Sequence, residues 1–245
     1  MDSYSTKISK VSELDNSTCN SLVELYLNYY DESNEQKILH DLAEKQEILL
    51  LHHNDLIVGF TTMEYYNYQW SGETVNIVFS GDTVIDRAHW GQQALAFRWI
   101  EHMGKMKAKQ PDIPFYWLLI VKGHRTFRYL PTFSKSFHPH WAIDRSDLKS
   151  LKDSLAIQKF GNTYNPHSGV VEYTISRGQL KDEIAFPSDE EMKKDAVKFF
   201  IKKNPNYLNG HELVCLCELE LENFKPLTKR VFRRAFDDRI MATAD

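Results

Sequence analysis

The stretch that decides the fold is Thr83-Val-Ile-Asp-Arg-Ala-His-Trp-Gly-Gln-Gln-Ala-Leu95, together with Ile113-Pro-Phe-Tyr-Trp-Leu-Leu-Ile-Val121. An apolar run at 83–86 leads into a turn, and residues 94–107 then carry apolar side chains at helical spacing. The second apolar run follows, and it is apolar on both faces, as a buried central strand would be. Two such runs joined by one helix predict a parallel strand–helix–strand unit.

The turn between the first run and the helix has the composition of an anion site. A helix N-terminus offers N–H groups and a positive dipole, so it suits a pyrophosphate. We expect Gln92, Gln93 and Ala94 to present such N–H groups, and Arg87 to pair with a phosphate through its guanidinium. The alternatives are plain helix initiation for the three helix-start residues, and an ion pair with Asp86 or a solvated turn for Arg87.

The chain before this unit has the pattern of two helices and a meander of strands. Asn54-Asp55 separates two strand-like runs and predicts a hairpin. Gly81 interrupts the next run, where it predicts a bulge or a close approach of backbone. The expected elements are a short strand at 7–11, helices at 16–30 and 38–46, strands at 47–52, 56–66 and 74–86, and a strand end followed by a loop within 66–72.

The chain after this unit is less regular. Ser188 with Glu191 three residues later has the spacing of a capping box, which predicts a helix that runs to about Lys203. A basic amphipathic helix is expected near the end of the chain, and its charged face reads as solvated. The remaining expected elements are helical turns within 123–137, a helix at 146–158, strands at 170–176 and 212–221, and that last helix at 228–240.

Composition sets broad limits. The chain has 245 residues, enough for one large domain with an appendage, with 42% hydrophobic and 26% charged residues. A net charge of -4 gives no reason to expect nucleic acid or a membrane as partner. Three cysteines and a polar N-terminus without an apolar segment predict a reducing, cytoplasmic location and no signal peptide. No Cys/His cluster has ligand spacing, so we expect no metal.

The order of these elements resembles the GCN5-related N-acetyltransferase (GNAT) superfamily over residues 7–140, as a divergent member. The resemblance is carried by the hairpin at 47–66, the turn at 87–95 and the segment 115–137. It implies an α/β protein with a GNAT-like mixed, largely antiparallel sheet flanked by helices. Residues 1–140 would form the acyltransferase core, and residues 141–245 a C-terminal α+β extension packed on it.

The resemblance also implies an activity: transfer of an acyl group from a thioester to a small-molecule amine by direct attack. The thioester would be acyl-CoA or an acyl carrier protein. The CoA phosphates would bind the turn, and the pantetheine arm would enter between splayed parallel strands. The implied cofactor-binding residues are Val84, Ile85, Arg87, Trp90, Gly91, Gln92, Gln93 and Ala94.

The chain departs from the family pattern at two points. The family turn has the form Gln/Arg-x-x-Gly-x-Gly/Ala, whereas Trp90 and Gln92 occupy the glycine positions here and Gly91 is one position off. Side chains at these positions obstruct close approach of backbone to phosphate. The family's tyrosine acid would fall at 132–133, and Tyr129 is the substitute candidate about one turn earlier.

Two acids are candidates for the base that the resemblance implies. Glu64 and Asp82 lie on neighbouring expected strands, where partial burial would raise a carboxyl pKa toward that of a useful base. The alternative is a carboxylate on a solvent face or at a bulge.

A different class of protein also fits the pattern, namely a non-catalytic GNAT-fold module that binds a ligand or a partner, and the missing glycines favour it.

Overall fold

The computed structural model describes residues 3–244, which fall into two compact units. Unit 1 is assembled from the ranges 1–26, 36–117 and 218–245, and unit 2 from 27–35 and 118–217. The units therefore do not follow a boundary at residue 140, because the last segment of the chain returns to unit 1.

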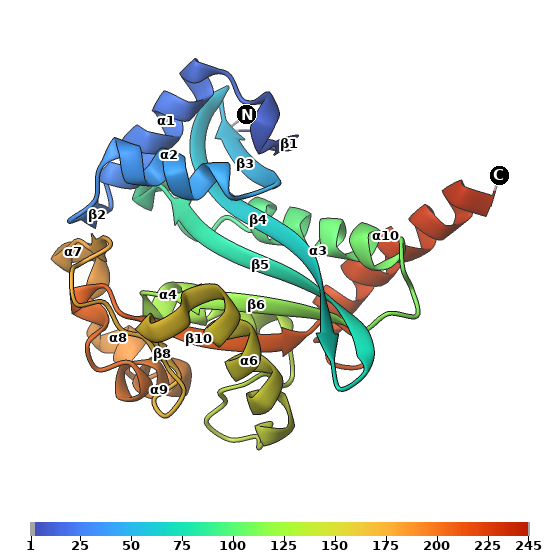
Figure 1. The fold of residues 1–245 in the computed structure, drawn as a ribbon. Helices are drawn as coiled ribbons and strands as arrows, with labels where there is room; N and C mark the ends of the chain where they lie inside the picture. Colours follow the sequence, from blue (N-terminus) through green and yellow to red (C-terminus); the bar gives the residue numbers. More distant parts are fainter. Residues whose placement is uncertain (1–2, 245) are drawn as a thin grey trace. The chain divides into compact units, whose positions relative to one another are not determined.

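Unit 1 contains an antiparallel ladder in the order β1, β3, β4, β5 (Figure 1). The expected hairpin is confirmed, with Asn54 and Asp55 at φ 48° and 67° in the turn. The strand end and loop expected at 66–72 are present, but the strand takes up most of this range, because β4 continues to Trp70, which pairs with Glu73 across a tight turn. Side chains that face each other across β4 and β5 stabilise this longer hairpin. The strand bounds are β1 (Tyr4–Lys10), β3 (Glu47–His53), β4 (Leu56–Trp70) and β5 (Glu73–Ile85).

The predicted strand–helix–strand unit is confirmed. The helix α3 (Ala94–Lys107) connects β5 to β6 (Phe115–Val121), and the two strands are neighbours in the sheet. Asn76 N donates to Pro114 O at 2.8 Å, and Trp117 Nε1 donates to Ser80 Oγ at 3.0 Å. From the first of these contacts to the second, the residue numbers increase on both strands, so β5 and β6 run parallel.

The strand β6 passes from unit 1 into unit 2 after Trp117. Its other neighbour is β10 (Glu212–Glu218). Leu219 N just beyond that strand donates to Phe115 O at 2.8 Å, and Lys122 Nζ just beyond β6 lies 3.8 Å from Glu212 Oε1, so the two strands run in opposite directions. The complete order is β1-β3-β4-β5-β6-β10-β8-β7. The sheet is thus eight-stranded, mixed and mostly antiparallel, as expected.

A β-bulge interrupts the β4–β5 ladder. Thr61 pairs with Thr83 and Met63 pairs with Ser80, so two residues of β5 oppose the single residue Thr62 of β4. The two opposing residues of β5 are Gly81 and Asp82, and the sequence predicts a bulge at Gly81. A bulge leaves part of the ladder unpaired and re-aims nearby groups, so it often lies beside a site.

Helices complete unit 1. The long helix α10 (Pro226–Ala244) packs along α3, and Figure 1 shows the two side by side. Gly104 allows this contact, since a Cβ at that position would lie 2.4 Å from Phe232 O. The other two helices are α1 (Asn16–Leu27) and α2 (Glu35–Ala43).

We expect Gly104→Ala to lower the free energy of unfolding by about 1–3 kcal/mol, because the added methyl group meets a backbone oxygen that cannot rotate away. The usual gain of about 1 kcal/mol for alanine over glycine in a helix opposes this loss but is smaller than it. The measurement is urea denaturation followed by circular dichroism. Lys105→Ala, a neighbouring change to a surface ion pair, is the control, and equal stability of the two variants would contradict the prediction.

Unit 2 is built from short elements. The capping box is confirmed, since Ser188 Oγ accepts from Glu191 N and the Glu191 carboxylate bonds back to Ser188. The single helix expected up to Lys203 is wrong, because Lys194 is extended and divides it. The strand expected at 170–176 is only two residues long. The bounds are β2 (Tyr30–Asp31), α4 (His124–Phe127), α5 (Tyr129–Phe133), α6 (Lys149–Phe160), β7 (Tyr164–Asn165), β8 (Val170–Val171), β9 (Gln179–Leu180), α7 (Asp182–Ala185), α8 (Asp189–Met192) and α9 (Asp195–Lys203).

Aromatic side chains form the core of unit 2. Phe127 is fully buried, and its ring centroid lies 5.8 Å from that of Phe137 and 5.9 Å from that of Phe200. These contacts hold α4 and α9 together. Along 3–244, no helix has the length and apolar character needed to cross a membrane.

Candidate functional site

The phosphate-type turn begins with a short 3-10 helix, Arg87–His89. The Asp86 carboxylate accepts from Ala88 N at 2.8 Å and caps this helix. Trp90 is anchored by its own indole, whose Nε1 donates to Ile85 O at 2.9 Å. The exposed Arg87 guanidinium lies 5.8 Å from the Trp90 ring centroid. The turn therefore presents a cation stacked on an aromatic ring.

The start of α3 follows at once. Gly91 has φ 91°, a conformation that favours glycine, and a Cβ there would meet nothing within 4 Å. The Gln92 side chain then folds over the helix start. Its Oε1 accepts from Ala94 N at 2.7 Å and from Leu95 N at 3.4 Å. Two helix-start N–H groups thus converge on one oxygen atom.

The positions of these N–H groups and of the Gln92 side chain decide whether the turn can bind a phosphate. The N–H groups of Ala94 and Leu95 are aimed at an oxygen acceptor, which is what a phosphate oxygen would supply. The Gln92 amide occupies that position, so a phosphate would bind there only after the side chain rotates. Gln92 Nε2 is buried and has no hydrogen-bond partner within 3–244, which lowers the cost of that rotation.

The two candidate acids lie on the same hairpin. Glu64 on β4 pairs with Phe79, and Asp82 lies at the bulge opposite Thr62. Two ladder positions separate them, and β5 then continues through Val84 and Ile85 toward the turn. Unit 1 therefore brings together both acids and all the residues expected to hold the phosphates.

Tyr129 belongs to unit 2. It begins α5, and its ring stacks on that of Phe133 with centroids 5.7 Å apart. Burial raises the pKa of Tyr129, so the phenol is protonated at neutral pH. It can therefore act as a hydrogen-bond donor and as an acid, but not as a base.

A group of charges in unit 2 surrounds Glu191, and its basic members lie within residues 124–128, just before Tyr129 in the chain. Arg125 Nη2 donates to Glu191 Oε2 at 2.9 Å, and Arg128 Nη1 lies 3.8 Å from Oε1. His124 is buried, with Nε2 3.3 Å from the same oxygen. Burial by itself raises the pKa of Glu191, but the Ser188 N–H and the Arg125 guanidinium outweigh it and hold the pKa at about 2.

This shift gives a pH dependence. Glu191 has a folded pKa of about 2, below its ordinary value of 4.5, so its ionised form stabilises the folded state at any pH above about 4.5. That contribution is lost as the pH falls from 4.5 to 2. We expect Glu191→Gln to be less stable than the parent at pH 7, and the difference to shrink across that window. Denaturant unfolding at a series of pH values measures it.

Glu190→Gln is the matched control, because Glu190 is adjacent, exposed and paired only with the exposed Lys193 among the described residues. We expect it to change stability little at any pH. A pH-independent difference between Glu191→Gln and the parent would show that the Glu191 charge does not stabilise unit 2.

Sequence patterns did not indicate several of these features. The Glu191 cluster joins α4 to α8, and the Gln92 cap depends on a side-chain rotamer. A further pair, His102 Nε2 and Glu47 Oε2 at 2.6 Å, joins α3 to β3. The only sequence signal for any of them is the capping box at Ser188, which predicts that Glu191 turns back toward its own helix start.

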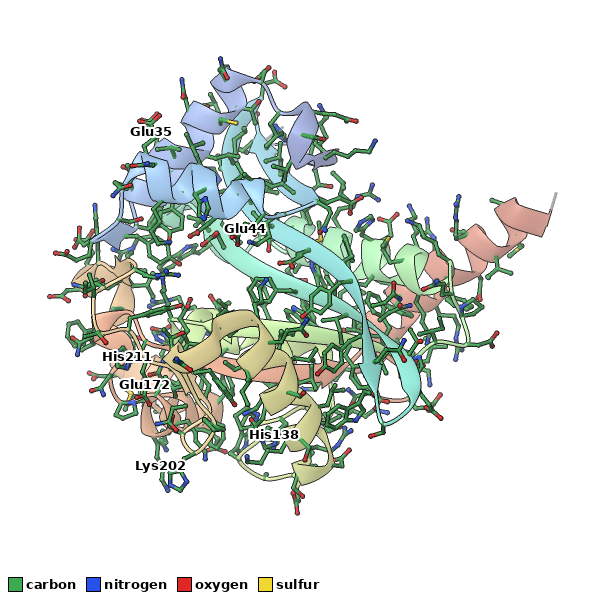
Figure 2. All side chains as sticks on the ribbon, in the orientation of Figure 1. Glu35, Glu44, His138, Glu172, Lys202 and His211 are labelled. Atoms are coloured by element: carbon green, nitrogen blue, oxygen red, sulfur yellow. The ribbon has the colours of Figure 1, made fainter. Side chains whose placement is uncertain are left out.

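A second buried group of ionisable side chains lies in unit 2. Tyr164 OH donates to Asp153 Oδ1 at 2.5 Å, and Lys152 Nζ lies 3.2 Å from the same oxygen. Burial lowers the pKa of Lys152 and lowers that of His138 to about 4 (His138 is labelled in Figure 2). Burial also raises the pKa of Cys215. Within the described residues, these groups do not form a metal site.

The chain was compared with protein families, curated proteins and solved structures. No protein-family model and no curated protein sequence matches the chain. Solved structures of GNAT proteins match about half of it. An Escherichia coli GNAT-family N-acetyltransferase, YhbS, in complex with CoA is 13% identical, with a TM-score of 0.39 over 54% of this chain and 69% of that chain.

Two other solved structures are similar. A Pseudomonas aeruginosa acyl-CoA N-acyltransferase is 16% identical, with a TM-score of 0.37 over 52% of this chain and 85% of that chain. A probable N-acyltransferase from Enterococcus faecalis is 11% identical, with a TM-score of 0.39 over 54% of this chain and only 33% of that chain. The chain thus spans a third of the length of the Enterococcus protein. At these TM-scores the likeness carries no conclusion about the fold family or the reaction.

Proposed function

We propose that the protein is an N-acyltransferase that moves an acyl group from a thioester to the nitrogen of a small-molecule amine by direct attack. The observation that carries the proposal is a β-bulge at Gly81 and Asp82, placed on β5 just before the phosphate-type turn and beside the parallel strand β6. The bulge supplies backbone donors for a carbonyl oxygen, and the turn supplies donors for phosphates.

The spacing of these two features supports acyl-CoA as the donor. Five residue steps separate Asp82 from Arg87, which corresponds to about 17 Å of extended strand. A pantetheine arm laid along Val84 and Ile85 would place its phosphates at the turn and its thioester at the bulge. An acyl carrier protein carries the same arm, so it remains the second possible donor.

The reaction needs a proton to leave the amine and a proton to reach the departing thiolate. In the proposed mechanism Glu64 or Asp82 accepts a proton from the substrate ammonium, directly or through water, and the neutral amine then attacks the thioester carbonyl. Backbone N–H groups at the bulge stabilise the oxyanion of the tetrahedral intermediate. Tyr129, whose phenol is protonated, donates to the thiolate as the carbon–sulfur bond breaks.

The second candidate function is a non-catalytic module that binds a ligand or a partner. The Gln92 cap favours it, because the helix-start donors already have an acceptor. Titration calorimetry with CoA and a set of acyl-CoAs, followed by an assay of acyl transfer to a set of amines, separates the two. Binding without transfer would leave the module as the better account.

We expect Arg87→Ala to weaken CoA binding by about 1–3 kcal/mol, the scale for loss of a charge-assisted hydrogen bond. The guanidinium is exposed at the turn, so its removal should not disturb the core. Titration calorimetry measures the affinity. Arg98→Ala is the control, since Arg98 lies on α3 and pairs with Glu101 away from the turn. Equal affinity of parent and Arg87→Ala would make Arg87 a structural residue.

We expect one of the two acids to be the base. Glu64→Gln and Asp82→Asn keep the size of the side chain and remove its ability to accept a proton. The variant that lacks the base should transfer the acyl group about 10² to 10⁴ times more slowly, and its pH profile should lose the limb that reports the base. If both variants keep the parental rate and profile, positioning and solvent account for the proton transfer.

A further inference from the structure

The N–H donors at the start of α3 are held by a side chain that comes just before the helix. Gln92 Oε1 accepts from Ala94 N at 2.7 Å and from Leu95 N at 3.4 Å. Gln93, which has the usual capping position, makes no side-chain hydrogen bond to the helix start. Within 3–244, the side chain that occupies these two donors is therefore that of Gln92.

This cap is weaker than a phosphate would be in the same place. The contact with Leu95 N is longer than an ordinary N–H···O bond, so one amide oxygen serves the two donors unequally. The other end of the amide, Gln92 Nε2, is buried and lacks a hydrogen-bond partner among the described residues. A phosphate has several charged oxygen atoms, and charge-assisted hydrogen bonds are roughly twice as strong as neutral ones. A phosphate can therefore displace the amide, whereas a neutral acceptor gains nothing over it.

The turn beside the amide has room for this exchange. Gly91 is exposed, and a Cβ on it would meet nothing within 4 Å. Gln93 on the other side is exposed as well. The Gln92 side chain can therefore swing away from the helix start into solvent, where its Nε2 gains the partners that it lacks. No other element has to move for the two N–H groups to become free.

We propose that Gln92 is a built-in competitor at the phosphate-type turn, which rests on the proposed function in that the phosphate would belong to the acyl donor. The side chain keeps the helix-start donors occupied until a phosphate displaces it. Such a competitor reduces the apparent affinity by the fraction of molecules in which the site is open. It also makes the site selective, because a thioester that carries a phosphate recruits these donors and one without a phosphate does not.

The experiment measures the binding of three probes, CoA, phosphopantetheine and pantetheine, by titration calorimetry with the full chain. The probes share the pantetheine arm and differ in their phosphates, so pantetheine is the control ligand. Gln92→Ala removes the competitor and keeps every backbone donor. Gln92→Glu keeps the acceptor and gives it a negative charge, which strengthens its bonds to the N–H groups and repels phosphate.

The matched control variant is Gln69→Ala. Gln69 is exposed and donates to Thr74 Oγ1 at 2.7 Å, near the tight turn that joins β4 to β5. This turn is at the opposite end of β5 from Arg87, so the change removes a glutamine hydrogen bond without touching the start of α3. We expect this variant to bind all three probes as the parent does.

We expect Gln92→Ala to bind CoA about fivefold more tightly than the parent, the factor that corresponds to a side-chain cap of ordinary strength. Gln92→Glu should bind CoA about tenfold more weakly. The affinity for pantetheine should not change, since it has no phosphate to place at the helix start. A gain for CoA alone assigns the place of the amide to the outer phosphate, and a gain for phosphopantetheine as well assigns it to the phosphate that an acyl carrier protein also bears.

Stability separates a competitor from a cap with a structural role only. Loss of the cap should lower the melting temperature of Gln92→Ala slightly while it raises the affinity for CoA. A side chain that only supports the helix would lower both when removed. A CoA affinity of Gln92→Ala equal to or weaker than that of the parent, or no CoA binding by the parent and both Gln92 variants, would overturn the competitor.

The same measurements separate the competitor from the proposed reaction. Tighter CoA binding by Gln92→Ala, without acyl transfer to any amine by parent or variant, would support the competitor and reject the N-acyltransferase. Acyl transfer by the parent, with a CoA affinity that does not depend on Gln92, would support the reaction and reject the competitor.

Discussion

The pairing of one residue of β4 against two of β5 is the constraint on which the rest of the site depends. A hydrogen bond of 2.7 Å between the side chains of Thr61 and Thr83 fixes the ladder on one side of the bulge. On the other side, Ser80 accepts from the Trp117 indole and so ties the bulge to β6. Because both flanks are fixed, the additional residue cannot slide along the strand. Its backbone groups are held at a fixed position on β5, between the Glu64–Phe79 pair and the start of the turn.

The helix α3 follows the bulge in the chain and is itself fixed against the rest of unit 1. Its first turn is capped by the Gln92 side chain, and its middle is held against α10 by the close approach at Gly104. A helix fixed at both points can aim its N-terminal N–H groups at one location. The side chain that caps those groups is also the one that a phosphate would have to displace, so binding at the turn would involve a local exchange of acceptors, with no movement of the helix.

Buried charges in the two units are balanced in different ways. Glu191 is surrounded by Arg125, Arg128 and His124, so its charge stabilises unit 2 and needs no further partner. Among the described residues, Lys45 donates to a backbone oxygen and lies 4.0 Å from the exposed Glu44 carboxylate. Its charge is therefore balanced mainly by a backbone acceptor, whereas that of Glu191 is balanced by side chains of opposite charge.

Local patterns in the sequence were enough for the elements whose cause is local. The apolar spacing predicts α3 at residues 94–107, the Asn54-Asp55 pair predicts the hairpin, and Gly81 predicts the bulge, because periodicity and turn chemistry act over a few residues. The family resemblance then led to the candidate acids and the turn. Tertiary structure alone decided that Lys194 divides the predicted helix, and that Lys45 lies beside Gly81 at the bulge. Residues from separate elements come together only when the sheet has formed, and no spacing along the chain encodes that contact.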